Sequence, residues 1–160
     1  MSSAVPRRLA LLGLLSLAGC GFAPVYGDTS GLRGQVTIDS PESVAGFRLR
    51  DRLEQRLGVA TQPRYALSVE LGSTQRPAAI TAEGDTVRFN VVGDADWVLR
   101  NGSDGQVIDR GTIQTFTSYA ATGSTVATQA AATDAQARLS VALADAIVSR
   151  LLVLTADLDG

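Results

Sequence analysis

Polar and apolar residues alternate along several stretches of the chain, as they do in strands that bury one face. The clearest example is residues 65–71, in which every second side chain is apolar. Strands are predicted at residues 35–39, 65–71, 86–99 and 106–118. Gly93 interrupts the third of these, and we expect a β-bulge there. Between the second and third strands, residues 72–85 are expected to form an extended arm and a reversal of direction.

Two further stretches have the three- and four-residue spacing of amphipathic helices. The first should begin with Ser40 as the N-cap and Pro41 at the first helical position, and should end at Gly58. Its expected apolar face consists of Val44, Phe47, Leu49, Leu53 and Leu57. The second helix is predicted over residues 125–154, with firm packing from about Ala132. Its expected apolar stripe consists of Ala132, Gln136, Leu139, Leu143, Ile147, Leu151 and Leu154.

The predicted order of elements is strand, helix, three antiparallel strands and helix. A sheet and two amphipathic helices each have one apolar face that must be buried. Packing both helices on the same side of the sheet buries all three faces together. We therefore predict an α+β fold: a two-layer sandwich with a four-stranded, mostly antiparallel sheet and two helices on one face.

The first 19 residues have the layout of an export signal. Arg7 and Arg8 precede an apolar block, residues 9–17, that is about half as long as a membrane-spanning helix requires. The block ends in Leu-Ala-Gly-Cys, which resembles the lipobox of bacterial lipoproteins, with Cys20 as the lipidated residue. A buried, unmodified cysteine is the alternative interpretation. In that family the thiol receives a diacylglyceryl group and the new amino terminus a further acyl chain such as palmitate, which together give a lasting membrane anchor.

This interpretation divides the chain into three parts. Residues 1–19 are expected to be a signal peptide that is cleaved before Cys20, residues 20–35 a lipidated flexible tether, and residues 36–158 a single α+β domain. Gly21 follows the cysteine, and glycine at this position favours sorting to the outer membrane in enterobacteria.

Charge and residue content restrict the possible functions. Without the two arginines of the signal peptide, 12 arginines remain against 16 acidic residues, a formal net charge of −4, which argues against nucleic-acid binding. The chain has no histidine and one cysteine, so we expect no metal site, no cofactor and no disulfide. An enzyme would depend on carboxylates alone, and a cluster of Glu70, Asp94 and Asp96 is its best support.

Four arginines of the first helix, Arg48, Arg50, Arg52 and Arg56, allow two interpretations. They could form a basic patch for an anionic lipid, or a solvated helix face whose charges are offset by nearby acids. We expect the solvated face.

The residues from Cys20 to Gly27, CGFAPVYG, resemble the CGFxPLYG signature that follows the lipobox in alphaproteobacterial proteins of the LptE family. The layout of the remaining chain is similar as well, including Phe47 to Leu53 in the first helix and the Asp134-Ala135 and Arg138-Leu139 pairs in the second. Ala23 and Val25 depart mildly from the signature.

The resemblance implies an outer-membrane lipoprotein without catalytic activity, anchored at the periplasmic face. Proteins of that family act as a plug inside the β-barrel translocon LptD, support assembly of the barrel and assist delivery of lipopolysaccharide to the outer leaflet. Lipopolysaccharide carries phosphates that arginine binds well, and Arg76, Thr81 and Arg88 are the candidate contacts in this chain. The alternative function is that of an auxiliary lipoprotein subunit of an ABC-type system for lipid traffic.

Overall fold

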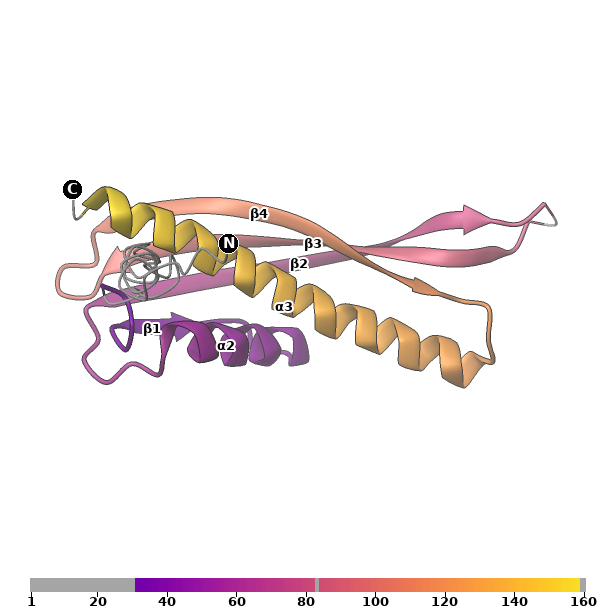
Figure 1. Ribbon diagram of the computed structural model, residues 1–160, viewed down its shortest axis with the longest axis horizontal. Coiled ribbons are helices and arrows are strands. Elements are labelled where there is room, and N and C mark those ends of the chain that lie inside the picture. The colour runs from indigo at the N-terminus through magenta and orange to yellow at the C-terminus, as the bar shows by residue number, and fades with distance from the viewer. Residues whose placement is uncertain (1–30, 83, 159–160) are drawn as a thin grey trace, which may run out of the picture.

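One long sheet and two helices of unequal length make up the described part of the chain (Figure 1). The computed structural model describes residues 31–82 and 84–158. Its elements, in chain order, are β1 (Val36–Asp39), α2 (Val44–Leu57), β2 (Tyr65–Ile80), β3 (Thr86–Asn101), β4 (Val107–Ala120) and α3 (Thr125–Leu158). This is the order that the sequence predicts.

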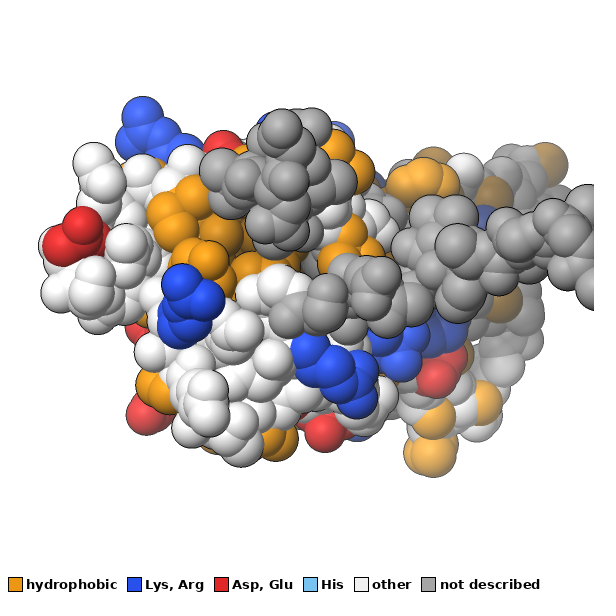
Figure 2. All heavy atoms as spheres, turned by 60° about the vertical axis from the view of Figure 1, so that its left-hand side comes forward, with side chains coloured by type: hydrophobic (Ala, Val, Ile, Leu, Met, Phe, Trp, Pro, Cys, Tyr) orange, Lys and Arg blue, Asp and Glu red, His pale blue; other side chains and the backbone are white. Residues whose placement is uncertain are grey.

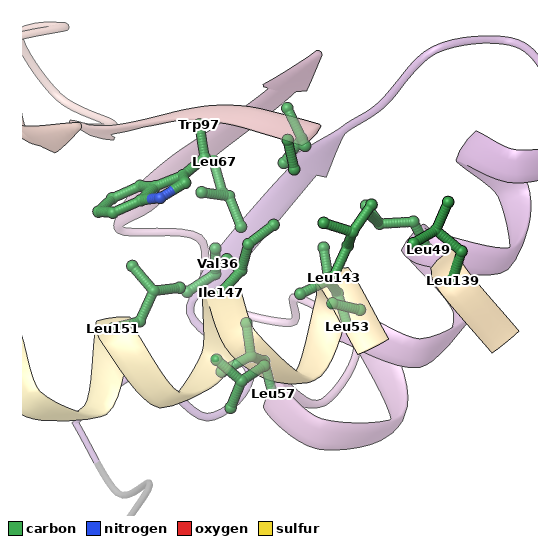
Figure 3. Packing of buried hydrophobic residues seen from close by; sticks show 14 of the residues in the cluster. Val36, Leu49, Leu53, Leu57, Leu67, Trp97, Leu139, Leu143, Ile147 and Leu151 are labelled. Carbon is green, nitrogen blue, oxygen red and sulfur yellow. The ribbon is translucent and has the colours of Figure 1, made fainter. Parts of the chain in front are cut away.

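The strands lie in the sheet in the same order as in the chain, β1-β2-β3-β4. β1 runs parallel to β2, whereas β3 is antiparallel to both of its neighbours. Side chains from the strands and from both helices meet in one buried cluster, so the helices share a face of the sheet (Figure 3). The prediction of a two-layer α+β sandwich with a mostly antiparallel sheet is confirmed.

The two faces of the sheet differ in what covers them. Odd-numbered positions of β3 are buried under the helices, among them Val91, Ala95 and Trp97, whereas Asp96 and Arg100 are exposed on the other side. The strand register places even-numbered residues of β2 and β4 on that second side as well. We call this helix-free side the open face.

α2 starts three residues later than expected. Its N-cap is Ser43, whose hydroxyl accepts a hydrogen bond from the Gly46 N–H at 3.1 Å. Gly58 ends the helix as predicted, with a φ of 78° that favours glycine. The buried residues are Gly46, Leu49, Leu53 and Leu57. Val44 and Phe47 were expected on this face but are 72% and 60% exposed, because they lie around the helix from the buried leucines.

The apolar stripe of α3 is buried in its second half only. Leu139, Leu143, Ile147 and Leu151 are buried, whereas Ala132 is half-buried and Gln136 is exposed. The first fully buried residue of the helix is Ala135, three positions after the predicted start of firm packing. The amino-terminal turns of α3 therefore extend past the part of the core that α2 helps to cover.

β2 and β3 are longer and more regular than the sequence indicates. Each has 16 residues and spans roughly 50 Å at about 3.3 Å per residue. The predicted bulge at Gly93 is wrong, since Gly93 pairs in register with Ser73 and Thr115. The irregularities lie instead at Pro77 to Ile80 and at Leu99/Arg100.

The described chain is already packed before β1. Leu32 is 2% exposed and belongs to the core, and the Gly34 N–H donates to the Leu57 carbonyl at 2.8 Å. The chain is thus packed by Leu32 at the latest, inside the stretch that was expected to be a flexible tether up to residue 35. Among the described residues, no helix has the length and apolar character needed to cross a membrane.

Candidate functional site

The candidate contacts Arg76 and Arg88 lie near the outer end of the β2–β3 hairpin, which projects to one side of the molecule (Figure 1). Arg76 pairs with Asn90, and Arg88 lies two residues before Asn90 on the same strand. Both arginines are therefore on the open face as diagonal neighbours, which in a sheet lie roughly 7–8 Å apart. Both are exposed, and no acidic residue of the described chain forms an ion pair with them.

Thr81, the third candidate, belongs to the turn that joins β2 to β3. Its N–H donates to the Asp85 carbonyl at 2.8 Å, and its hydroxyl accepts from the Asp85 N–H at 3.2 Å. Its carbonyl accepts from the Gly84 N–H at 3.1 Å. Thr81 therefore stabilises the turn through its backbone and its hydroxyl oxygen, and its O–H, which none of these bonds uses, can still donate to a phosphate.

On its helix side, this hairpin is held by contacts among Gln75, Phe89 and Tyr119 that were not predicted from the sequence. The rings of Phe89 and Tyr119 stack with centroids 5.5 Å apart, and the Gln75 side-chain amide donates to the Tyr119 hydroxyl. Phe89 and Tyr119 are directly paired across β3 and β4. The alternation of β4 could have placed Tyr119 on the buried face, but its partner depends on the register, which the sequence does not specify.

A cavity of 250 Å³ opens between the start of α2, the middle of β2 and α3. Leu71, Leu139 and Leu143 form apolar parts of its wall, and among the residues that the structure describes Arg48 is the only charged one that lines it. Arg48 also borders two shallower hollows that continue along α3. The cavity exists because α2 covers about 21 Å of a much longer sheet, at 1.5 Å per residue.

Two other arginines of α2 link the helices instead of forming a solvated face. Arg52 donates from two nitrogens to the two Asp145 oxygens at 3.0 Å each, and Arg56 donates to Asp145 Oδ1 at 2.9 Å. The hydrogen bonds that Arg52 donates to Asp145, and then the negative charge of Asp145, raise the pKa of Arg52.

The acids that would support an enzyme do not converge in a cleft. Glu70, Asp94 and Asp96 lie on the open face in neighbouring rows, where Glu70 pairs with Asp96 and Gly72 with Asp94. The Asp96 carboxylate accepts a hydrogen bond from the Thr112 hydroxyl. No cluster of three potential metal ligands occurs among the residues that the structure describes.

The predicted lipid attachment residue, Cys20, lies outside the described residues, as do Gly21 and the rest of the CGFAPVYG segment. Glu83, within the reversal expected at residues 72–85, also lies outside them. The candidate site is therefore the outer hairpin, with two unpaired arginines on the open face and a hydrogen-bonded turn at its end.

Comparison with known proteins identifies relatives at the level of family and fold. Residues 34–151 match the model of the family described as LptE, lipopolysaccharide-assembly. A lipoprotein from Caulobacter crescentus CB15 has the same fold with a TM-score of 0.67 and 23% identity, over 84% of this chain and 97% of the other.

Two further solved structures share the fold at lower identity. Rare lipoprotein B from Shewanella oneidensis aligns with a TM-score of 0.63 and 10% identity, over 79% of this chain and 99% of the other. A lipoprotein B from Nitrosomonas europaea aligns with a TM-score of 0.59 and 12% identity, over 76% and 84%. No curated protein matches the chain.

Proposed function

We infer the function from one premise: the chain belongs to the LptE family of lipopolysaccharide-assembly proteins, whose model matches residues 34–151. From this membership we propose that it is an outer-membrane lipoprotein, anchored through Cys20 at the periplasmic face. It would plug the LptD β-barrel, support assembly of that barrel and assist delivery of lipopolysaccharide to the outer leaflet. This role needs no catalytic residues.

The outer hairpin supports a direct contact with lipopolysaccharide. Arg76 and Arg88 are exposed neighbours on one face, and no described acid pairs with them. A pair of guanidinium groups can bind phosphate through two parallel hydrogen bonds each, so the phosphates of lipid A are suitable ligands. We propose Arg76 and Arg88 as the phosphate contacts.

The barrel partnership is tested by purifying the lipidated protein from membranes in mild detergent. We expect recovery of a β-barrel protein, and depletion of the lipoprotein should leave that barrel immature and reduce lipopolysaccharide at the cell surface. Recovery of ABC-transporter subunits without a barrel would instead support the alternative function. Normal barrel maturation and normal lipopolysaccharide export after depletion would reject the proposal.

The hairpin contact is tested separately with the Arg76→Gln/Arg88→Gln double variant. Each hydrogen bond to a charged group contributes about 1.5–3 kcal/mol, so we expect at least a tenfold loss of lipopolysaccharide affinity with unchanged barrel association. The control is Arg76→Lys/Arg88→Lys, which keeps both charges but loses the bidentate geometry. Its lipopolysaccharide affinity should lie between that of the unmodified chain and that of the Gln double variant. Unchanged affinity in both variants would remove the hairpin from the binding site.

A further inference from the structure

Three arginines gather at the opposite end of the open face from the candidate site. Ala66 pairs with Arg100, and Val98 pairs with Arg110, so Arg100 and Arg110 are diagonal neighbours on adjacent strands. Arg64 lies two residues before Ala66, directly ahead of β2, and its carbonyl accepts from the Gly102 N–H at 2.7 Å. All three side chains are exposed. We call Arg64, Arg100 and Arg110 the base arginines.

The structure fixes the positions of these residues. The Arg64 N–H donates to the Gln35 carbonyl at 2.8 Å, and the Arg100 guanidinium donates to the Gly105 carbonyl in the β3–β4 turn at 3.3 Å. No described acid forms an ion pair with any base arginine. Three acids of this region have other partners: Asp104 accepts from the Gln106 N–H, and Asp96 accepts from the Thr112 hydroxyl. Asp109 accepts from the Arg110 backbone N–H at 2.8 Å and lies 3.7 Å from the Arg150 guanidinium.

The amino-terminal chain reaches the domain at this same end. The hydrogen bond between Gln35 and Arg64 joins the start of the described chain to the base arginines. Cys20 precedes Gly31 by 11 residues, which span at most about 39 Å when fully extended. A lipid at Cys20 would therefore hold this end of the domain within about 39 Å of its leaflet, whereas the outer hairpin lies about 40 Å further along the sheet.

Apolar side chains are exposed at this end as well. Val59 follows α2 and is 66% exposed, Val107 pairs with Arg100 and is 42% exposed, and Val153 near the end of α3 is 56% exposed. Figure 2 brings this end of the molecule forward and shows apolar side chains and arginines at its surface. Arginines mixed with apolar side chains are typical of surfaces that lie at the membrane interface.

We propose that the base arginines bind the phosphates of anionic phospholipid headgroups in the leaflet that carries the lipid anchor. The base arginines add three positive charges to a chain that is acidic overall, so the attraction comes from their local arrangement and not from net charge. The inference uses the anchor at Cys20 from the proposed function but is independent of the barrel and of lipopolysaccharide.

The test measures vesicle binding by the mature chain, residues 20–160, with Cys20→Ser, so that no lipid contributes. Each arginine near an anionic surface is worth about 1 kcal/mol, or roughly fivefold in affinity. In low salt we expect binding to vesicles of phosphatidylethanolamine and phosphatidylglycerol and none to phosphatidylcholine vesicles. Replacing Arg64, Arg100 and Arg110 with Gln should weaken binding by about 100-fold.

The matched control removes the same charge elsewhere, through Gln at Arg48, Arg50 and Arg138, none of which is proposed to bind phosphate. This control should bind within a few fold of the unmodified chain. Equal losses in both triple variants would mean that net charge alone drives binding, and would overturn the proposal. So would equal binding to both kinds of vesicle. If the base variant kept its vesicle binding but no longer copurified with a barrel, the surface would be a protein interface, and the proposal would also be wrong.

Discussion

Replacing Gly93 with valine should loosen the contact between the sheet and α3. A Cβ built at Gly93 would lie 2.6 Å from Leu139 Cδ2 and 3.0 Å from Leu139 Cγ. Leu139 is 4% exposed, and the free space beside it is the cavity between α2, β2 and α3. Inserting methyl groups into a packed core costs typically 1–3 kcal/mol, and we expect a loss of about 2 kcal/mol because Leu139 can shift partly into that cavity. For a domain of this size, that lowers the melting temperature by roughly 5–10 °C.

Gly72→Val is the matched control, because Gly72 lies one row away on the neighbouring strand and on the open face. The atoms nearest to its added Cβ belong to the Asp94 carboxylate, with Oδ2 at 2.4 Å, and this half-buried carboxylate is the end of a flexible side chain that can rotate away. We expect a change within about 0.5 kcal/mol, as for other surface positions. The single tryptophan, Trp97, is 2% exposed, so its fluorescence during urea unfolding reports the free energy in each variant.

A double-mutant cycle separates the steric cause from a general intolerance of β3. Leu139→Ala alone should cost about 2–5 kcal/mol through the cavity that it leaves. The Gly93→Val/Leu139→Ala double variant should lose at least 1 kcal/mol less free energy of unfolding than the sum of the two single losses, because the valine would occupy space that the leucine vacates. Additive losses, or a stable Gly93→Val chain, would refute the assignment of Gly93 to a close approach.

Three further variants test the helices. Asp145→Ala should lower the melting temperature at low salt because two guanidinium groups lose their shared acceptor, and the loss should be smaller in 1 M NaCl. The control Asp134→Ala breaks an exposed ion pair and should change the melting temperature little. Ser43→Ala should cost about 1 kcal/mol in urea unfolding, and recovery by Ser43→Asp would identify the loss as that of the N-cap. Gly58→Ala should cost about 1–3 kcal/mol, measured by calorimetry, because a φ of 78° with a ψ of 155° is essentially restricted to glycine. Gly58→Asn should cost about as much, and a stable variant of either kind would argue against backbone strain.

The sequence predicted the elements and the architecture because their signals are local. Alternation identifies β2, and the leucine spacing with Gly58 identifies α2 and its end. What could not be predicted depends on contacts between distant elements. Gly93 looks like an interruption in the sequence, and only the position of Leu139 shows why glycine is needed there. Asp145 likewise has no local signal for its two partners, which lie on α2.

For the candidate site, too, the sequence indicated the region but not the contacts between distant residues. Arg76 and Arg88 were proposed as residues of one region, and the strand register brings them to one face. The sequence could not reveal that register, because the turn at Thr81 and the irregularity after Pro77 together determine which residues oppose each other. The base arginines were missed since they lie on three different segments, at positions 64, 100 and 110.

The separation between the two arginine groups makes the two proposals compatible. Arg88 and Arg100 are 12 residues apart on β3, which corresponds to about 40 Å along the strand. A bilayer with its headgroup regions is about 40–45 Å thick. If the base arginines contact headgroups of the inner leaflet and the hairpin points along the membrane normal, Arg76 and Arg88 reach the level of the outer-leaflet headgroups. A shorter sheet could not reach the headgroups of both leaflets at once. Removing two residue pairs from β2 and β3 between the two arginine groups should therefore impair lipopolysaccharide delivery, while vesicle binding by the base arginines persists.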